Sequence, residues 1–462
     1  MGRLVAPHLS KGLGVKAPRT AKFGHWKSDP LLPDSRIEHD PVSTGVRDFR
    51  LVEEAKTMKL DQQIGALWRQ FDDKSTARNL HSRPFRILCL DGGGIRGILS
   101  ANILSRIMKH NPNFLNNTDA LFGTSVGGIL SLLLAAGYDV EECEEIFRFA
   151  MPHIFGHDPY RKLNPFNSKY CDKTKEELMK YFFGDLKMGD LQRLCTVIAF
   201  RLDGRRSETH SFFNKEGWRP AILSNMPQGK SDVQPDTDLL VWEAAMMTSA
   251  APTYFPVFKG YTDGGIVANN PSILALSKVM AHFPNINTRN AALLSIGAGN
   301  FPRHTEIFSS NDDSGLTPSY LGARGHRRLG VRADWGIKQW VPFLLDILLD
   351  GDSITTEMVV HYLLTASGSK MYHRLDPLLP KQFVLDDIDS VEELKEFAVG
   401  LDIDDTLGYV SQFWCDVETQ GAYPLGRRAA GEWITLGENG LEGGRTSYND
   451  AWHAAFRHNN RQ

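Results

Sequence analysis

The sequence lacks the segments that would place a chain across a membrane or export it. Its first 20 residues include basic residues but no apolar stretch that could form the core of a secretory signal peptide. An N-myristoylation signal fails as well, because Ala6 stands where that motif requires Ser or Thr. The longest apolar run, at residues 129–136, is about half of what a membrane-spanning helix needs. We therefore expect a cytoplasmic protein with at most peripheral membrane contact.

The sequence also has few cysteines and a small net charge. The formal net charge of -3 is small for 462 residues and gives no indication of a nucleic-acid partner. No cluster of His, Cys, Asp or Glu has the spacing of metal ligands, so we expect neither a metal nor a cofactor. Reduced, mostly buried thiols are the expected state of the five scattered cysteines, which are Cys89, Cys143, Cys171, Cys195 and Cys415.

The sequence does have the composition and length of a globular protein with two or three domains. Residues 1–83 are rich in Pro, Gly and charge and are expected to form an N-terminal extension. A catalytic domain is expected at 84–303, and a C-terminal helical covering region with a flexible tail at 304–462. Helical patterns in the two flanks lie at Leu51–Phe71, Ile337–Leu349 and Met358–Leu364.

Short apolar runs alternate with helical patterns in the middle of the chain. The runs suited to buried strands lie at 85–90, 120–122, 194–200 and 292–296. Helical spacing of apolar residues follows the first two runs, at 98–107 and 129–136. Such alternation predicts an α/β domain with a largely parallel sheet.

Residues 123–127 read GTSVG and fit the G-x-S-x-G pattern of a sharp turn from a strand into a helix. The turn lifts the Ser125 hydroxyl out of the sheet, at a helix N-terminus whose N–H groups favour an alkoxide. Gly123 and Gly127 are needed because a side chain at either position would collide with the neighbouring strand or helix. The pentapeptide alone also occurs in structural turns, but the strand before it and the apolar helix after it favour a nucleophile.

The glycine-rich segment DGGGIRG at 91–97 has two interpretations. As G-x-G-x-x-G after a strand, with Asp119 as the ribose-binding acid, it could hold a dinucleotide. That acid would end the second strand, however, whereas here the chain continues through Leu121 and Phe122 into the serine turn. The dinucleotide interpretation is therefore the weaker one.

In the other interpretation, consecutive glycines expose the backbone N–H groups of Gly93 and Gly94 as an oxyanion hole for an intermediate on Ser125. Arg96, within the same loop, is suited to bind a phosphate near the scissile ester. Its alternative role is to brace the loop through backbone carbonyls or a nearby carboxylate.

The base that serves Ser125 has two kinds of candidate. The chain contains 15 histidines, but none lies in a recognisable motif, and we expect those in polar loops to be ordinary surface residues: His81, His110, His153, His157 and His326. Asp263, in the sequence TDGG, is the other candidate, although Asp before two glycines is also common in turns.

Four motifs together resemble the signature set of the patatin-like phospholipases. They are DGGGIRG at 91–97, GTSVGG at 123–128, TSAAPTYF at 248–255 and DGG at 263–265, in that order. The resemblance covers residues from about 84 to 300, and none of these positions departs from the pattern.

The resemblance implies a three-layer α/β/α fold with a mainly parallel central sheet and a Ser–Asp dyad without histidine or metal. Carried onto this chain, the dyad is Ser125 and Asp263, and the oxyanion donors are Gly93 and Gly94. Arg96 stands where relatives place an arginine that faces the lipid headgroup.

The implied activity is hydrolysis of fatty acyl esters of phospholipids or galactolipids in membranes or micelles. Asp263, desolvated beside Ser125, would have a raised pKa, accept the serine proton and pass it to the leaving alcohol. The helices at 129–136 and 337–364 are candidates to supply an apolar channel for the acyl chain, whereas any single leucine among them is expected to belong to the packed core. The alternatives are a neutral-lipid or small-ester hydrolase, an acyltransferase, and an effector or storage protein that a partner activates.

Overall fold

The computed structural model describes residues 83–156, 167–203, 217–226, 235–301, 305–307, 327–329 and 337–414. The chain separates into two units, Met1–Glu54 and Ala55–Gln462, and all described residues belong to the second. The helical pattern expected at 51–71 and the glycine-rich tail at 438–445 lie outside the described residues.

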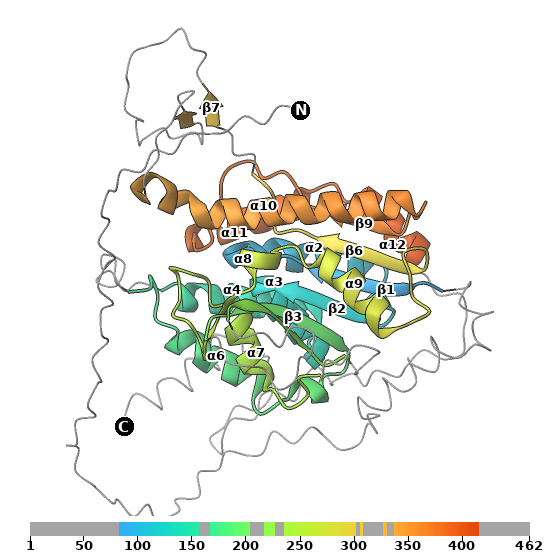
Figure 1. Cartoon of the computed structure of the whole chain (residues 1–462), viewed down its shortest axis with the longest axis horizontal. Coiled ribbons are helices and arrows are strands. Elements are labelled where there is room, and N and C mark those ends of the chain that lie inside the picture. The colour runs from blue at the N-terminus through green and yellow to red at the C-terminus, as the bar shows by residue number, and fades with distance from the viewer. Residues whose placement is uncertain are drawn as a thin grey trace, which may run out of the picture. The chain divides into compact units, whose positions relative to one another are not determined.

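A seven-stranded sheet in the order β4-β3-β2-β1-β6-β9, with β5 also paired to β3, lies at the centre of this unit (Figure 1). The neighbours from β3 through β9 run parallel, whereas β4 and β5 are antiparallel to β3. The strands are β1 (Phe85–Leu90), β2 (Ala120–Thr124), β3 (Leu194–Arg201), β4 (Arg219–Ser224), β5 (Tyr261–Asp263), β6 (Ala291–Ile296) and β9 (Tyr372–Leu375). A separate short pair joins β7 (Thr305–Ile307) to β8 (Arg327–Leu329). The expected α/β fold with a mainly parallel sheet is confirmed.

Helices cover both faces of this sheet, and β1 shows why. Leu88 and Leu90 face one apolar cluster, while Phe85, Ile87 and Cys89 face the other, as alternate residues of a strand must. The first cluster includes side chains of α2 (Gly97–His110), α3 (Ser125–Ala136), α4 (Val140–Ile154), α6 (Lys173–Phe183), α7 (Val241–Thr248), α11 (Val391–Gly400) and α12 (Asp404–Phe413). The second is covered by α9 (Ser272–His282) and α10 (Ile337–Ala366). Burial on both faces explains the near-continuous apolar strands.

The two helical patterns expected after residue 336 belong to one helix, α10. The sequence suggests a break because polar residues stand in the middle, yet these find partners in the loop before α9. Asp352 accepts a hydrogen bond from the backbone N–H of Asn270 at 3.1 Å, and Ser353 accepts one from the Asn269 side chain at 3.0 Å. The polar stretch therefore remains helical.

The region after residue 303 also contributes a strand, which the sequence did not predict. β9 pairs in parallel with β6, from Leu293 opposite Tyr372 to Ile296 opposite Leu375. Its four residues, YHRL, mix polar and apolar side chains and are all half-buried, so they carry no apolar run of the kind that marks the inner strands.

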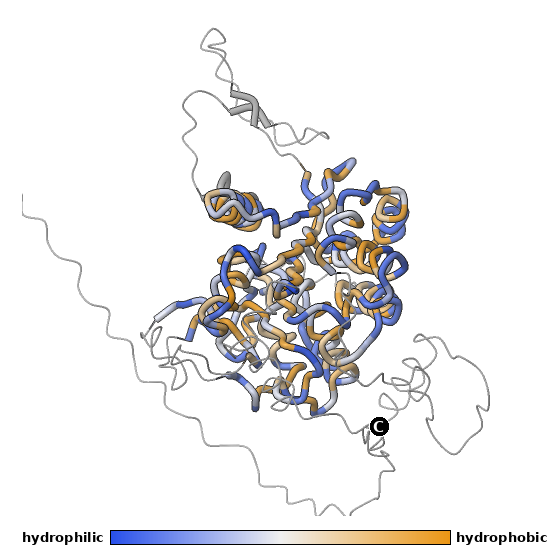
Figure 2. Tube along the Cα trace, turned by 90° about the vertical axis from the view of Figure 1, so that its right-hand side faces the viewer, coloured by the Kyte–Doolittle hydropathy of each residue, from blue (hydrophilic) through white to orange (hydrophobic). Residues whose placement is uncertain are grey.

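Figure 2 shows hydrophobic residues, in orange, interspersed with hydrophilic ones, in blue, throughout the described part of the chain. None of the described helices is both long and apolar enough to cross a membrane. Of the cysteines, Cys89, Cys143 and Cys195 are buried and Cys171 is half-buried, all as free thiols, while Cys415 lies outside the described residues.

Candidate active site

Ser125 occupies the sharp turn between β2 and α3. Its φ of +54° lies in the left-handed region, a conformation that costs a non-glycine residue about 1–2 kcal/mol. The turn is tightly packed, because a Cβ at Gly123 would lie 2.3 Å from the Gly127 carbonyl oxygen, and one at Gly127 would lie 2.4 Å from the Leu90 oxygen. A side chain at Gly123 or Gly127 would therefore clash with the backbone, which explains why both positions are glycine.

Thr248 holds this turn and was not identified as a site residue from the sequence. Its hydroxyl accepts a hydrogen bond from the Ser125 backbone N–H at 3.0 Å and donates one to the Ile198 carbonyl at 2.5 Å. The sequence did contain a signal for this role, because Thr248 is the first residue of the TSAAPTYF motif.

Sheet register brings Asp263 beside Ser125. β2 pairs with residues 194–198 of β3, and β5 pairs with residues 199–201, so Thr124 lies opposite Ile198 while Asp263 lies opposite Ala199. The Ser125 Oγ donates a hydrogen bond to Asp263 Oδ2 at 2.6 Å. The other carboxylate oxygen, Oδ1, accepts from the Gly265 N–H at 2.7 Å. The Asp263 carboxylate is thereby oriented toward the serine.

The environment of Asp263 suits a base at neutral pH. Its side chain is buried, and burial raises the pKa of Asp263 to about 6. Hydrogen bonds from Ser125 and Gly265 and the charge of Lys175 act in the opposite direction. Asp263 is therefore mostly ionised at pH 7 but has a higher proton affinity than an exposed carboxylate.

Lys175, on α6, is a buried cation in the same pocket and was missed in the sequence. Its Nζ donates to the Ser249 carbonyl at 2.9 Å and lies 3.9 Å from the centre of the Phe255 ring. Burial lowers the pKa of Lys175 to about 8, while Asp263 supports its charge. The sequence signal for its burial is helical spacing. Lys175 precedes Leu178 by three residues and Phe182 by seven, so it lies on the apolar face of the helix.

The glycine loop lies against the serine. A Cβ at Gly92 would stand 3.1 Å from the Ser125 Cβ. Gly93 and Gly94 both line the pocket, and no described residue accepts a hydrogen bond from their backbone N–H groups. Gly94 has a φ of +59°, and a Cβ there would lie 2.2 Å from the Leu385 carbonyl oxygen, so only glycine fits. Gly93 and Gly94 thus lie at the same pocket as Ser125 and Asp263, and their role as oxyanion donors stays a prediction.

Arg96 is buried beneath this loop. Its Nε donates to the Gly93 carbonyl at 3.3 Å, and its Nη1 donates to the Gly299 carbonyl at 2.9 Å. Arg96 does not belong to the pocket lining. These contacts correspond to the bracing role, which the sequence left open as the alternative to headgroup binding.

The pocket around the dyad is mainly apolar. Ile129 of α3 and Leu345 and Leu349 of α10 line it, so both of the helices considered for an acyl channel reach the pocket. Other apolar lining residues are Val126, Met151, Ile154, Phe155, Ala251, Pro252, Tyr254, Phe255, Ile266 and Leu385. None of the described residues that line the pocket is a histidine.

Those of the candidate histidine bases that the structure describes do not line the pocket around Ser125. His110 is exposed and bonded to Ser411, and the ring of His153 is bonded to the Phe149 carbonyl. His81, His157 and His326 lie outside the described residues. Within the described ranges, no group of three or more His, Cys, Asp or Glu side chains could hold a metal ion.

Comparison with known proteins agrees with this geometry. A family model described as patatin-like phospholipase matches residues 88–276, which contain Ser125, Asp263 and both glycine motifs. The cGAMP-activated phospholipase of Vibrio cholerae is 26% identical over 329 residues, which are 65% of this chain and 84% of that protein. The mouse 85/88 kDa calcium-independent phospholipase A2 is 28% identical over 257 residues, covering 52% of this chain and 30% of that protein.

Among solved structures, VipD from Legionella pneumophila matches 71% of this chain and 79% of its own, at 11% identity and a TM-score of 0.26, too low to bear on function. The family model and the curated relatives carry the assignment. Residues 88–276 therefore match the patatin-like phospholipase family, and these similarities identify the chain as a lipid hydrolase.

Proposed function

We propose that this chain hydrolyses fatty acyl esters of phospholipids, with Ser125 as nucleophile and Asp263 as the base. The observation that carries the proposal is the 2.6 Å hydrogen bond from Ser125 Oγ to the buried Asp263 carboxylate, inside an apolar pocket. A nucleophile within hydrogen-bond reach of a base, and a base oriented by a third group, is the arrangement that activates serine.

The chemical steps follow from these contacts. Asp263 takes the Ser125 proton as Oγ attacks the ester carbonyl, and the N–H groups of Gly93 and Gly94 stabilise the oxyanion that forms. The bond to the leaving alcohol breaks as Asp263 returns the proton to the alcohol oxygen, which leaves an acyl group on Ser125. Water then attacks the acyl-enzyme carbonyl, giving up its proton to Asp263. The bond between the carbonyl carbon and Ser125 Oγ breaks as Asp263 returns that proton to Oγ, and the fatty acid is released.

The pocket walls account for the choice of a lipid. Apolar side chains from α3, α4, α8 (Gly265–Ala268) and α10 surround the dyad. Burial of an acyl chain there would be favourable by about 25 cal/mol per Å² of apolar surface. In this proposal Arg96 braces the glycine loop through the Gly93 and Gly299 carbonyls and does not read the headgroup.

Helix α10 supports peripheral contact with the lipid surface. Eight large apolar side chains of α10 are exposed: Leu344, Ile347, Leu348, Ile354, Met358, Val359, Tyr362 and Leu363. Leu345 and Leu349, on the other side of the same helix, line the pocket. A contiguous exposed apolar face is uncommon on proteins that have no partner surface. Lipid that meets this face would lie next to the pocket wall.

Phospholipid vesicles provide the test. The purified wild-type chain is incubated with vesicles, and the released fatty acids and lysophospholipids are identified by mass spectrometry. Ser125→Ala removes the nucleophile, and Ser277→Ala, at an exposed position on α9, is the matched control. We expect fatty acid release by the wild type and the control only. Release by Ser125→Ala would assign the chemistry to another nucleophile.

A further inference from the structure

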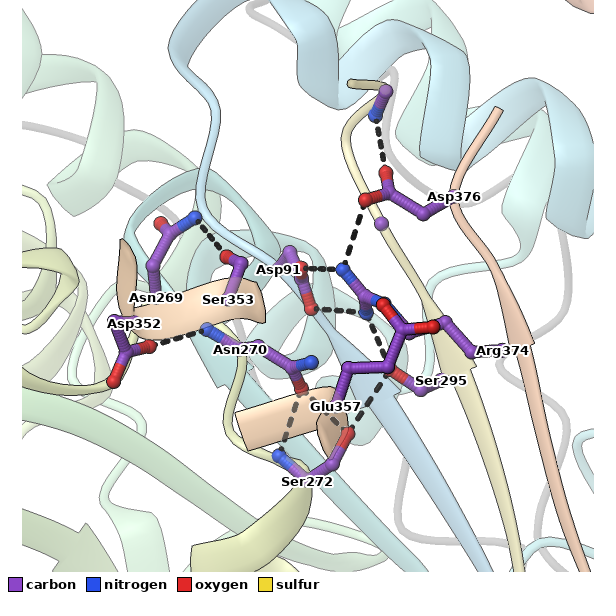
Figure 3. A network of polar contacts seen from close by, with 12 residues as sticks. Asp91, Asn269, Asn270, Ser272, Ser295, Asp352, Ser353, Glu357, Arg374 and Asp376 are labelled. Atoms are coloured by element: carbon purple, nitrogen blue, oxygen red, sulfur yellow. Dashed lines mark hydrogen bonds and ion pairs between the residues drawn. The ribbon is translucent and has the colours of Figure 1, made fainter. Parts of the chain in front are cut away.

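Arg374, on β9, lies outside the matched family domain and makes the most connected buried ion pair of the described residues. Its Nη1 and Nη2 donate to the two carboxylate oxygens of Asp91 at 3.2 and 2.7 Å, in a bidentate pair (Figure 3). The guanidinium also donates to Ser295 Oγ at 2.7 Å and to Asp376 at 3.1 Å. The Arg374 and Asp91 side chains are only 4% and 3% exposed, so the pair is shielded from water.

Asp91 is the first residue of the glycine loop. It follows β1, its N–H donates to the Ile296 carbonyl at 3.1 Å, and the chain continues directly into Gly92, Gly93 and Gly94. The Asp91 carboxylate does not line the pocket and has no contact with the dyad in the described part of the chain. Its partner Arg374 therefore acts on the loop and not on the reacting groups.

The same C-terminal region holds the loop at two more points. Leu385 accepts a hydrogen bond from the Ile95 N–H at 2.9 Å. The Gly92 N–H donates to the Asn269 carbonyl at 3.2 Å, and the Asn269 side chain is in turn held by Ser353 of α10 (Figure 3). Residues between 352 and 385 thus hold the glycine loop in place, directly or through Asn269.

We propose that Arg374 is a positioning residue for catalysis, whose bidentate pair with Asp91 holds the glycine loop so that the Gly93 and Gly94 N–H groups face the oxyanion. The proposal rests on the proposed function, since it assigns a role within that reaction. It also makes the segment after residue 303 part of the catalytic unit.

The chemistry of the pair sets what each substitution does. Burial disfavours the charge of Arg374, but Asp91 and Asp376 outweigh burial and raise its pKa, so the guanidinium is charged. Lysine keeps the charge but has no planar fork, so it cannot bind both oxygens of Asp91 in the same geometry. Removal of Arg374 leaves the buried Asp91 carboxylate without a counter-ion. In the double variant that charge is gone as well, and the carboxylates that lose the cation are those of Asp376 and Glu357, which are 20% and 50% exposed.

The test measures kcat and KM for a soluble, uncharged p-nitrophenyl ester, with thermal unfolding as the check on folding. The variants are Arg374→Lys, Arg374→Met, Asp91→Asn and the double variant Arg374→Met/Asp91→Asn. Arg148→Met is the matched control, because Arg148 forms only an exposed ion pair with Glu392.

We expect folded Arg374→Lys to lose about 10- to 100-fold in kcat with KM within about twofold, the range expected when oxyanion donors are misplaced. The double variant should recover part of the kcat that Arg374→Met loses, and Arg148→Met should match the wild type. Where Arg374→Met does not fold, Arg374→Lys and Asp91→Asn carry the test.

Unchanged kcat in folded Arg374→Lys, or a higher KM with unchanged kcat, overturns the inference. An active wild type with either result leaves the proposed hydrolase function standing, whereas an inactive wild type contradicts the proposed function itself. The two failures are therefore distinguishable.

Discussion

The acid side of the pH–rate profile follows directly from the burial of Asp263. Because burial raises its pKa to about 6, the carboxylate that we propose as the base is lost as pH falls through that value. The ionised fraction is then about 90% at pH 7 and about 10% at pH 5. We expect kcat/KM to fall about tenfold between these pH values, whereas an exposed aspartate, with a pKa of about 3.9, would lose less than a tenth of its activity.

The assay is the initial rate on a soluble, uncharged ester from pH 4.5 to 8 at constant ionic strength, so that screening stays the same. Lys175→Met removes the cation that lowers the pKa of Asp263, and should move the midpoint to higher pH. Lys180→Met, at an exposed position on the same helix, is the control and should leave the midpoint in place.

Three results would each refute a part of this reasoning. A midpoint near 4 would mean that Asp263 is solvated during catalysis. A midpoint near 6 that moves strongly with temperature would indicate an imidazole, because ionisation of a carboxyl has little enthalpy and ionisation of histidine has much more. A midpoint that Lys175→Met leaves unchanged would remove Lys175 from the electrostatics of the base.

Four further outcomes are expected. Ser125→Ala and Asp263→Asn should each lower kcat at least about 10³-fold, and the double variant should be no worse than either, as for residues that act as one unit; additive losses would contradict the dyad. Arg96→Ala should depress phospholipid and p-nitrophenyl ester hydrolysis equally, because Arg96 donates to the Gly93 and Gly299 carbonyls and so holds the loop that both substrates use; a selective loss on phospholipid would restore the headgroup role. Chelators should leave hydrolysis of the soluble ester unchanged, and a calcium requirement there would argue against a metal-free dyad. Ile354→Gln should weaken vesicle binding about three- to tenfold without affecting the soluble ester, and Thr365→Gln, exposed on the same helix, should not; equal binding by both variants would exclude α10 as the lipid-facing surface.

The strands and the serine turn could be predicted because their requirements are local. Apolar runs marked β1, β2, β3 and β6, since strands covered on both faces need apolar residues throughout. Gly123 and Gly127 were identified for the steric reason that the structure shows, because any Cβ there meets backbone within about 2.4 Å. Polar β9 and the unbroken α10 were missed, because their partners come from distant segments.

The sequence by itself determined the α/β architecture, the serine turn, the glycine loop and the aspartate that follows them, because each is written in a few adjacent residues. Only the tertiary structure decided which charged groups serve the site. Arg374 is 283 residues from Asp91, and Lys175 is 88 residues before Asp263, so no local pattern links either pair. Arg96 was noticed for its position in the loop, but its partners include Gly299, which is 203 residues away. A buried charge is defined by what surrounds it, and those surroundings exist only once the sheet has brought distant segments together.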